Sequence, residues 1–210
     1  MSDALRELVA VMDRLRSPGG CPWDAEQTHA SLVPYAIEEA YELAEAVEAD
    51  DRANLREELG DLLLQVVFHA RIAQEDPHDP FDVDDVARDL VAKLVRRHPH
   101  VFADASADDL HGQWDRIKRA EKQRGSALDG VPLALGALAR AQKLLGRAQR
   151  AGLDDASVVG APDEPTELGA RLLALVREAQ AAGLDAEGEL RRAGAAWEQR
   201  VRRAEVGRNF

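Results

Sequence analysis

The sequence predicts an all-α protein. Apolar residues recur every three or four positions along most of its 210 residues, which is the spacing of one helix face. No segment shows a convincing alternation of apolar and polar residues, the pattern of a strand that is half buried in a sheet. Clusters of proline and glycine separate the periodic segments, so we expect a series of distinct helices.

The first predicted helix covers residues 3–16 and stops where Ser17–Gly20 breaks the pattern. Its apolar positions are Leu5, Leu8, Val9, Met12 and Leu15. Residues 21–24 are expected to form a loop that leads into a second helix of about 31–49. Pro34 is tolerable there because it would lie in the first turn, where a backbone N–H has no helical partner.

Three more helices are expected before a linker at 125–132. The first covers about 54–75, the second is capped by Asp82 and runs to about 97, and the third covers about 107–123. The first of these must end before the two prolines of 76–80, which cannot continue a helix. The second is followed by residues 98–102, which we expect to be irregular. Ser106 and Asp109 resemble a capping arrangement for the third.

Beyond the linker, the sequence predicts a smaller helical unit that is rich in alanine and arginine. A helix of about 134–151 is closed by Gly152, and two further apolar-periodic segments follow a stretch rich in glycine, proline and aspartate. The predicted domains are therefore residues 1–130 and 131–210.

The composition excludes several classes of protein. With 45% hydrophobic residues the chain can bury a sizeable core, so it is not a disordered tail. The net charge of −12 argues against binding to a nucleic-acid polymer or an acidic membrane, because both would repel it. Cys21 is the single cysteine, so no intramolecular disulfide can form. The sequence shows no long apolar run at its start, and we expect a cytoplasmic protein.

The most informative feature is a pair of acidic clusters on the second and third predicted helices. They are Glu38-Glu39-x-x-Glu42 and Glu58-x-x-Asp61. Residues three or four apart share one face of a helix, so each cluster presents its carboxylates at one level. For the first cluster alone a solvated helix face is a sufficient explanation, because its acids fall opposite an apolar stripe of Ile37, Tyr41 and Ala44.

The third predicted helix is harder to explain as a solvated surface. Apolar residues cover most of its circumference and leave a narrow polar stripe of Glu58, Asp61, Gln65 and His69. We expect a helix that is apolar nearly all round to be buried. Two carboxylates on it, with no Lys or Arg one turn away, would repel each other unless a cation is supplied. The sequence therefore favours a metal site formed by both clusters.

Four oxygen ligands without cysteine or histidine favour Mg²⁺, with Mn²⁺ as a substitute, over Zn²⁺. Magnesium commonly binds through substrate phosphates, which basic side chains would also contact. The chain offers such residues downstream, at Lys93, Arg96, Arg97, Lys118, Arg119 and Lys122. Taken singly, each is better explained as a solvated surface residue, and cations near a helix C-terminus also have an ordinary dipole reason to be there.

Five ordered motifs carry a resemblance to a known family. They are Gly20-Cys21-Pro22-Trp23-Asp24-x-x-Gln27-Thr28, Glu38-Glu39-x-x-Glu42, Glu58-Leu59-Gly60-Asp61-Leu62-Leu63, Arg96-Arg97-His98-Pro99-His100-Val101-Phe102 and Trp114-x-x-x-Lys118. Together they resemble MazG-type nucleoside triphosphate pyrophosphohydrolases, nearly end to end over residues 1–130.

The resemblance implies an all-α, MazG-like helical bundle that is completed by dimerisation. It also implies Mg²⁺-dependent hydrolysis of NTPs or dNTPs to the nucleoside monophosphate and pyrophosphate, which we expect to serve nucleotide-pool house-cleaning. The family's metal ligands fall on Glu39, Glu42, Glu58 and Asp61 of this sequence. Glu38 is implied as an outer-shell residue or as the catalytic base.

The resemblance also implies a set of substrate contacts. The polyphosphate is expected to meet Lys93, Arg96, Arg97 and Lys118. Trp114 is expected to pack against the nucleotide, and Trp23 and Asp24 to lie near its base and sugar. For Trp23, a core position beside the first helix is an equal alternative.

The C-terminal unit contains a faded copy of the third helix. Glu167-Leu168-Gly169-Ala170-Arg171-Leu172-Leu173 resembles the run at 58–64, but Ala170 stands where an aspartate is expected. No Glu-Glu-x-x-Glu run precedes it. We therefore predict one metal site per chain and a truncated, degenerate and catalytically silent second MazG-like unit, which serves dimer packing or regulation. A remnant without a role is the alternative.

Two other functions stay open from the sequence. One is a pyrophosphohydrolase with a narrower substrate, of the dUTP/dCTP type or acting on a phosphoribosyl nucleotide. The other is a non-catalytic nucleotide-sensing or interaction module. The breadth of the motif match favours the MazG-type enzyme, and the intact first cluster argues against a remnant. Base and sugar preference, one or two metal ions per site, and dimer or tetramer are not fixed by the sequence.

Overall fold

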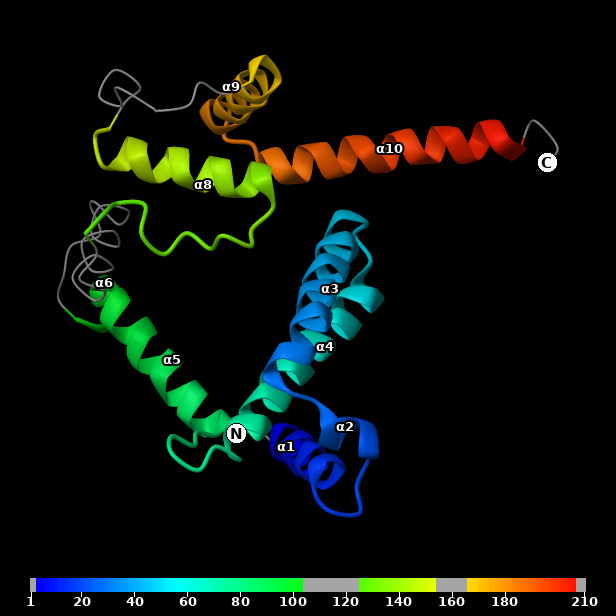
Figure 1. The fold of residues 1–210 in the computed structure, drawn as a ribbon, viewed down its shortest axis with the longest axis vertical. Helices are drawn as coiled ribbons and strands as arrows, with labels where there is room; N and C mark the ends of the chain where they lie inside the picture. The colour runs from blue at the N-terminus through cyan, green and yellow to red at the C-terminus, as the bar shows by residue number, and fades with distance from the viewer. Residues whose placement is uncertain (1–2, 104–124, 154–165, 207–210) are drawn as a thin grey trace. The chain divides into compact units, whose positions relative to one another are not determined.

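The computed structural model describes residues 3–103, 125–153 and 166–206. Every regular element in these ranges is a helix, which confirms the predicted all-α class (Figure 1). The chain divides into two compact units, Met1–Leu110 and His111–Phe210. The first unit contains both acidic clusters.

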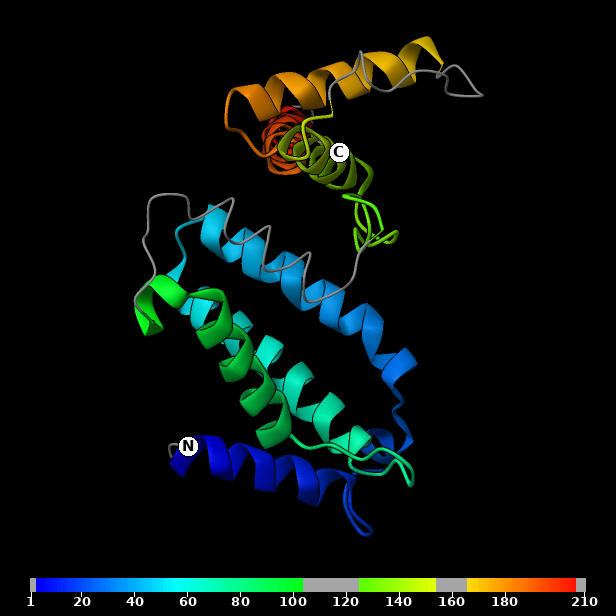
Figure 2. The ribbon, with the colours of Figure 1, turned by 90° about the vertical axis from the view of Figure 1, so that its left-hand side faces the viewer.

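The first unit is built on a hairpin of two long antiparallel helices. Its helices are α1 (Asp3–Arg16), α2 (Pro22–Glu26), α3 (His29–Glu48), α4 (Arg52–Ala73), α5 (Val83–Arg97) and α6 (Pro99–Phe102). Helices α3 and α4 lie side by side, and α1 and α5 both pack against α4 (Figures 1 and 2). The buried side chains of Met12, Leu32, Val67 and Phe68 form the core where α1, α3 and α4 meet.

Side chains at the helix starts explain where these elements begin. The Thr28 hydroxyl accepts a hydrogen bond from the Ser31 N–H, and the Ser31 hydroxyl accepts one from the Thr28 N–H. Asp51 caps α4 by accepting from the N–H groups of Ala53 and Asn54. Asp82 caps α5 as the sequence predicts, in a reciprocal arrangement with Asp85.

Three local predictions are wrong. Helix α3 begins at His29 rather than near 31, so Pro34 lies inside the helix and not in its first turn. The capping box at Thr28 fixes this earlier start. Residues 22–26 and 99–102, predicted as loop and irregular segment, form the short helices α2 and α6. Each begins with a proline, because the missing N–H has no partner at that position anyway. The predicted helix at 107–123 lies outside the described residues.

The burial of the hairpin differs from the sequence prediction in an informative way. The expectation that α4 is buried nearly all round is wrong for the single chain, since Leu59 is 53% exposed and Val66 is 45% exposed. Two members of the polar stripe are buried along with the core residues Val67 and Phe68, with Glu58 at 7% and Gln65 at 8% exposure. The reason is that α4 turns its polar stripe toward α3.

Helix α3 follows the same arrangement. Ile37 and Tyr41 of its predicted apolar stripe are about half exposed, whereas Glu39 is half-buried. The hairpin therefore encloses part of its acidic stripe beside its apolar core, and it leaves several large apolar side chains exposed.

The second unit contains three described helices, α8 (Ala137–Arg150), α9 (Glu167–Ala181) and α10 (Ala186–Val206). Helix α8 packs against both α9 and α10. Gln142 fixes the turn before α10, because its amide donates to the Leu184 carbonyl at 2.6 Å and accepts from the Ala186 N–H at 2.9 Å. Val176 of α9 is 1% exposed, the lowest value among the large side chains described in this unit. The predicted helix at about 134–151 corresponds to α8.

Candidate metal centre

The hairpin brings together three acidic residues that are 22 positions apart at most. One carboxylate oxygen from each of Glu39, Glu58 and Asp61 lies within 4.8 Å of the others. Glu39 comes from α3, while Glu58 and Asp61 are one turn apart on the facing side of α4. Glu58 is buried, and the other two are half-buried. The carboxylates thus converge inside the hairpin rather than on a solvated helix face.

The electrostatics of this cluster are unfavourable without a cation. Burial raises the pKa of Glu39, and the Asp61 carboxylate and a hydrogen bond with Glu42 raise it further. Burial likewise raises the pKa of Glu58, followed by repulsion from Glu42 and Asp61. Glu42 is itself exposed and lies at the edge of the cluster. A cation bound among these oxygens would remove the repulsion that raises both pKa values.

The donor set decides which cation fits. The cluster offers only carboxylate oxygens, and neither a cysteine nor a histidine belongs to it. Hard divalent cations such as Mg²⁺ and Mn²⁺ prefer such ligands, whereas Zn²⁺ prefers nitrogen and sulfur. Three or four protein ligands also leave coordination positions for water and phosphate, as Mg²⁺ commonly requires.

The group of three convergent carboxylates does not include Glu38. Glu38 lies on α3 and is exposed. Lys93, Arg96 and Arg97 lie in the last two turns of α5, a helix that packs against α4. Trp114 and Lys118 lie outside the described residues.

Trp23 and Asp24 lie on the short helix α2, just before α3. The Trp23 ring meets the rings of Tyr35 and Phe68 edge to face, at centroid distances of 6.0 and 6.4 Å. One half of the Trp23 side chain remains exposed. This residue therefore belongs to an aromatic cluster on the hairpin, and it keeps a free edge.

Arg16 holds α2 in place by hydrogen bonds, although no motif in the sequence points to it. Its guanidinium donates to both carboxylate oxygens of Glu75, at 2.8 and 2.9 Å. It also donates to the backbone carbonyls of Asp24 and Gln27, at 2.6 and 2.9 Å. Its side chain is only 7% exposed. No local signal marks this residue, because Glu75 is 59 positions away in the sequence.

A pair of histidines closes the other end of the space between α3 and α4. The Nδ1 atoms of His29 and His69 are 2.7 Å apart, and the rings are stacked with a 3° angle between their planes. Burial lowers the pKa of His69, and the proximity of His29 lowers it further. The sequence placed His69 on the polar stripe but gave no signal for its partner on α3.

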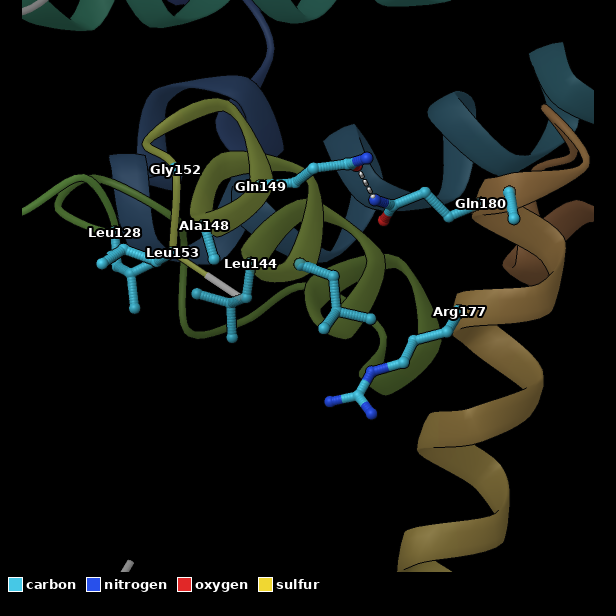
Figure 3. Close-up of a pocket in the computed structure, with 10 residues that line it drawn as sticks. Leu128, Leu144, Ala148, Gln149, Gly152, Leu153, Arg177 and Gln180 are labelled. Atoms are coloured by element: carbon cyan, nitrogen blue, oxygen red, sulfur yellow. Dashed lines mark hydrogen bonds between the residues drawn. The ribbon is translucent and has the colours of Figure 1, made fainter. Parts of the chain in front are cut away.

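The second unit has a cleft of a different character. It measures about 830 Å³ and its floor is largely leucine, with Arg177 and the hydrogen-bonded pair Gln149 and Gln180 at its edge (Figure 3). None of the described residues that line it is acidic. In α9, Ala170 is exposed and no group of three acidic or histidine ligands gathers among the described residues of this unit.

These observations define an all-α protein whose first unit carries a carboxylate centre suited to a hard divalent cation. The model of the MazG nucleotide pyrophosphohydrolase domain matches residues 27–102, which contain α3, α4 and the whole carboxylate centre. Among the described helices, none is long and apolar enough to cross a membrane.

Curated relatives extend the match over nearly the whole chain. An uncharacterised 26.1 kDa protein of Streptomyces cacaoi is 51% identical, over 96% of this chain and 82% of the relative. The nucleoside triphosphate pyrophosphohydrolase of Escherichia coli K12 is 41% identical, over 94% of this chain and 86% of the relative. The protein of that name from Mycolicibacterium smegmatis is 46% identical, over 97% of this chain and 60% of the relative. The chain belongs to the MazG nucleotide pyrophosphohydrolase family, whose members are hydrolases of acid anhydrides.

Proposed function

We propose that this protein is an Mg²⁺-dependent nucleoside triphosphate pyrophosphohydrolase that converts NTPs or dNTPs to the monophosphate and pyrophosphate. The observation that carries the proposal is the convergence of Glu39, Glu58 and Asp61 inside the hairpin. Two relatives carry this enzyme name, and the match to this chain covers 86% of the length of one and 60% of the length of the other. The raised pKa values of Glu39 and Glu58 support a site built for a cation.

Different residues of the chain bind the cation and the substrate. Glu39, Glu42, Glu58 and Asp61 hold the cation, with Mn²⁺ as a substitute for Mg²⁺. When bound, the cation supplies charge neutralisation for the phosphates and lowers the pKa of a nearby water. Lys93, Arg96, Arg97 and Lys118 bind the polyphosphate, Trp114 packs against the nucleotide, and Trp23 and Asp24 lie at its base and sugar.

The reaction requires one proton acceptor. A water oxygen forms a bond to the α-phosphorus, and the bond from that phosphorus to the bridging oxygen of the β-phosphate breaks. Pyrophosphate leaves with the bridging oxygen. Glu38, next to Glu39 on α3 and open to solvent, accepts the proton that the water loses.

The exposed apolar face of the hairpin supports a homodimer or a higher homo-oligomer. Ile37, Tyr41, Leu59 and Val66 are each about half exposed. A second copy of this chain that covers this face would complete the bundle and bury the side chains that the single chain leaves in water. Residues 1–130 then form the catalytic domain, and 131–210 form a degenerate MazG-like unit without a metal site.

The physiological task we propose is nucleotide-pool house-cleaning in the cytoplasm. An enzyme that releases pyrophosphate removes a triphosphate from use by polymerases in one step, and the net charge of −12 disfavours binding to nucleic-acid polymers. The partner of the site is therefore a free nucleotide.

Hydrolysis in ¹⁸O-labelled water tests the proposed chemistry. We expect a single ¹⁸O atom in the nucleoside monophosphate and none in the pyrophosphate, for a panel of NTPs and dNTPs with Mg²⁺. Label in pyrophosphate, or release of orthophosphate with a nucleoside diphosphate, would contradict attack at the α-phosphorus. Glu38→Gln is expected to slow turnover while the cation still binds, and an unaffected rate would remove Glu38 from its role.

A further inference from the structure

Gln65 is buried on the polar stripe of α4 and has an unsatisfied acceptor. Its residue exposure is 8%, and its side-chain oxygen Oε1 is buried without a hydrogen-bond partner among the described residues. A buried amide oxygen that lacks a donor is costly, and native proteins satisfy almost all such groups with protein atoms or ordered water. This oxygen therefore calls for a donor that the described residues do not supply.

The place of Gln65 on α4 points to the carboxylate centre as the source of that donor. Asp61 is one turn earlier on the same face of the helix. Helical side chains lean toward the N-terminus of their helix, so the Gln65 side chain extends over the turn that carries Asp61. On the following turn, His69 is already paired with His29 at 2.7 Å and closes the other end of the stripe.

Helix packing alone does not explain a glutamine at this position. Helix α9 repeats the Glu-Leu-Gly run of α4 and keeps most of its apolar positions, although Arg177 replaces Phe68. Val176 is 1% exposed, as Val67 is 4% exposed. In the same register, Ala170 stands in place of Asp61 and Ala174 in place of Gln65. Where the aspartate is absent, the glutamine is absent too, while the buried valine is retained.

We propose that Gln65 is a positioning residue of the metal centre, whose Oε1 accepts a hydrogen bond from a water ligand of the bound cation. This inference rests on the proposed function only in that a divalent cation occupies the carboxylate cluster. The amide oxygen fixes the orientation of that water and adds no charge to an already crowded acidic site. Glutamine suits the position because a fifth carboxylate would increase the repulsion among its neighbours.

Binding of Mn²⁺ or Mg²⁺ to the nucleotide-free protein, measured by calorimetry, tests the proposal. Gln65→Leu keeps the approximate size of the side chain and removes the acceptor. We expect it to weaken the cation affinity by about tenfold to a hundredfold, the usual effect of losing an outer-shell partner. The melting temperature of the cation-free variant should stay level or rise, because an unsatisfied polar group has been removed.

Two further variants keep the test decisive. Gln74→Leu changes an exposed glutamine at the end of the same helix and should leave the cation affinity unchanged. Gln65→Met is a second acceptor-free variant, which decides by the same criterion if Gln65→Leu does not fold. Cation affinity within twofold of wild type in the folded variant would overturn the proposal and leave Gln65 a packing residue.

The same measurement separates this proposal from the proposed function. If the wild-type protein binds the cation but hydrolyses no nucleotide, the proposed function fails while the affinity ratio still decides the role of Gln65. If the wild-type protein binds no divalent cation, both fail. If it hydrolyses nucleotides and Gln65→Leu retains full cation affinity, only the role of Gln65 fails.

Discussion

Glu58 is the residue whose surroundings conflict most strongly with its charge. It is only 7% exposed, and the carboxylates of Glu42, Asp61 and Glu57 repel its charge. The identities of such residues were predictable, because the spacing Glu-x-x-Asp on an apolar helix leaves few alternatives to a cation site. That Glu58 and Asp61 converge with Glu39 could be predicted only by assuming that the two helices pack as a hairpin.

Replacing Glu58 by glutamine tests this conflict directly. We expect Glu58→Gln to raise the melting temperature of the cation-free protein, because the variant removes a charge whose raised pKa reports burial and repulsion. The stabilisation that Mg²⁺ gives the wild type should disappear in the variant. Calorimetric melting with and without Mg²⁺ checks both effects. A variant that is less stable without the cation and still stabilised by it would contradict the assignment.

Arg16 joins the end of α1 to Glu75 and to the backbone of α2. Arg16→Met removes both guanidinium hydrogen bonds to Glu75, which keeps only Arg71 as a donor, and those to two backbone carbonyls. We therefore expect a loss of about 3 kcal/mol in the free energy of unfolding. Urea unfolding measures it. Arg14→Met is the control, since Arg14 makes only one exposed contact of 3.4 Å, and its cost should stay within about 0.5 kcal/mol. Equal costs for the two variants would show that the Arg16 contacts contribute little.

At the scale of the elements, the sequence located the helices because their start signals are local. Thr28, Asp51 and Asp82 each bond a backbone N–H two or three residues further on, so a short window of sequence contains the signal. No such local signal fixes the orientation of the helices. Which face of α3 and α4 is covered depends on contacts between elements, and for this reason the exposure of Ile37, Tyr41, Leu59 and Val66 was not foreseen.

The histidine pair between α3 and α4 gives a prediction about pH. Because the fold lowers the pKa of His69 below its ordinary value of 6.5, the unfolded chain binds more protons than the folded chain just below that pH. The contribution of this group to stability is therefore complete above pH 6.5 and decreases as the pH falls below it. We expect the wild type to lose more stability than His69→Gln between pH 7.5 and pH 5.5, about one unit either side of the ordinary histidine value.

Urea unfolding at both pH values measures that difference. The control is His78→Gln, since His78 lies in the exposed loop after α4 and should leave the pH dependence of the wild type unchanged. The same pH dependence in His69→Gln as in the wild type would show that the pair does not couple the fold to pH.

At the scale of the whole molecule, the two units have diverged in their chemistry. The first unit encloses carboxylates in its hairpin, while α9 in the second unit retains the apolar pattern of α4 without the aspartate. The sequence alone foresaw this asymmetry, because it depends on which residues are present. The assembly of copies, expected from the family resemblance and from the apolar circumference of α4, stays a prediction, since it depends on which apolar faces the fold leaves uncovered.

The outward apolar face of the hairpin predicts self-association. Ile37→Glu places a charge at a half-exposed site on α3, and we expect it to shift the protein to the monomer in sedimentation at micromolar concentration. Val11→Glu is the matched control, because Val11 is also about half exposed but lies on α1, away from this face. A wild-type protein that sediments as a monomer at every concentration would contradict a bundle completed by a second copy.

The most direct test of the account is an assay of products. The purified protein is incubated with NTPs and dNTPs in the presence of Mg²⁺, and monophosphate, diphosphate, orthophosphate and pyrophosphate are separated. We predict that the wild type forms monophosphate and pyrophosphate in equal amounts. Neither product should form when EDTA is added or in the Glu39→Ala variant. Products that persist in Glu39→Ala, or a wild-type protein that binds Mg²⁺ but converts no nucleotide, would contradict the central claim that the carboxylates of the hairpin form a catalytic metal centre.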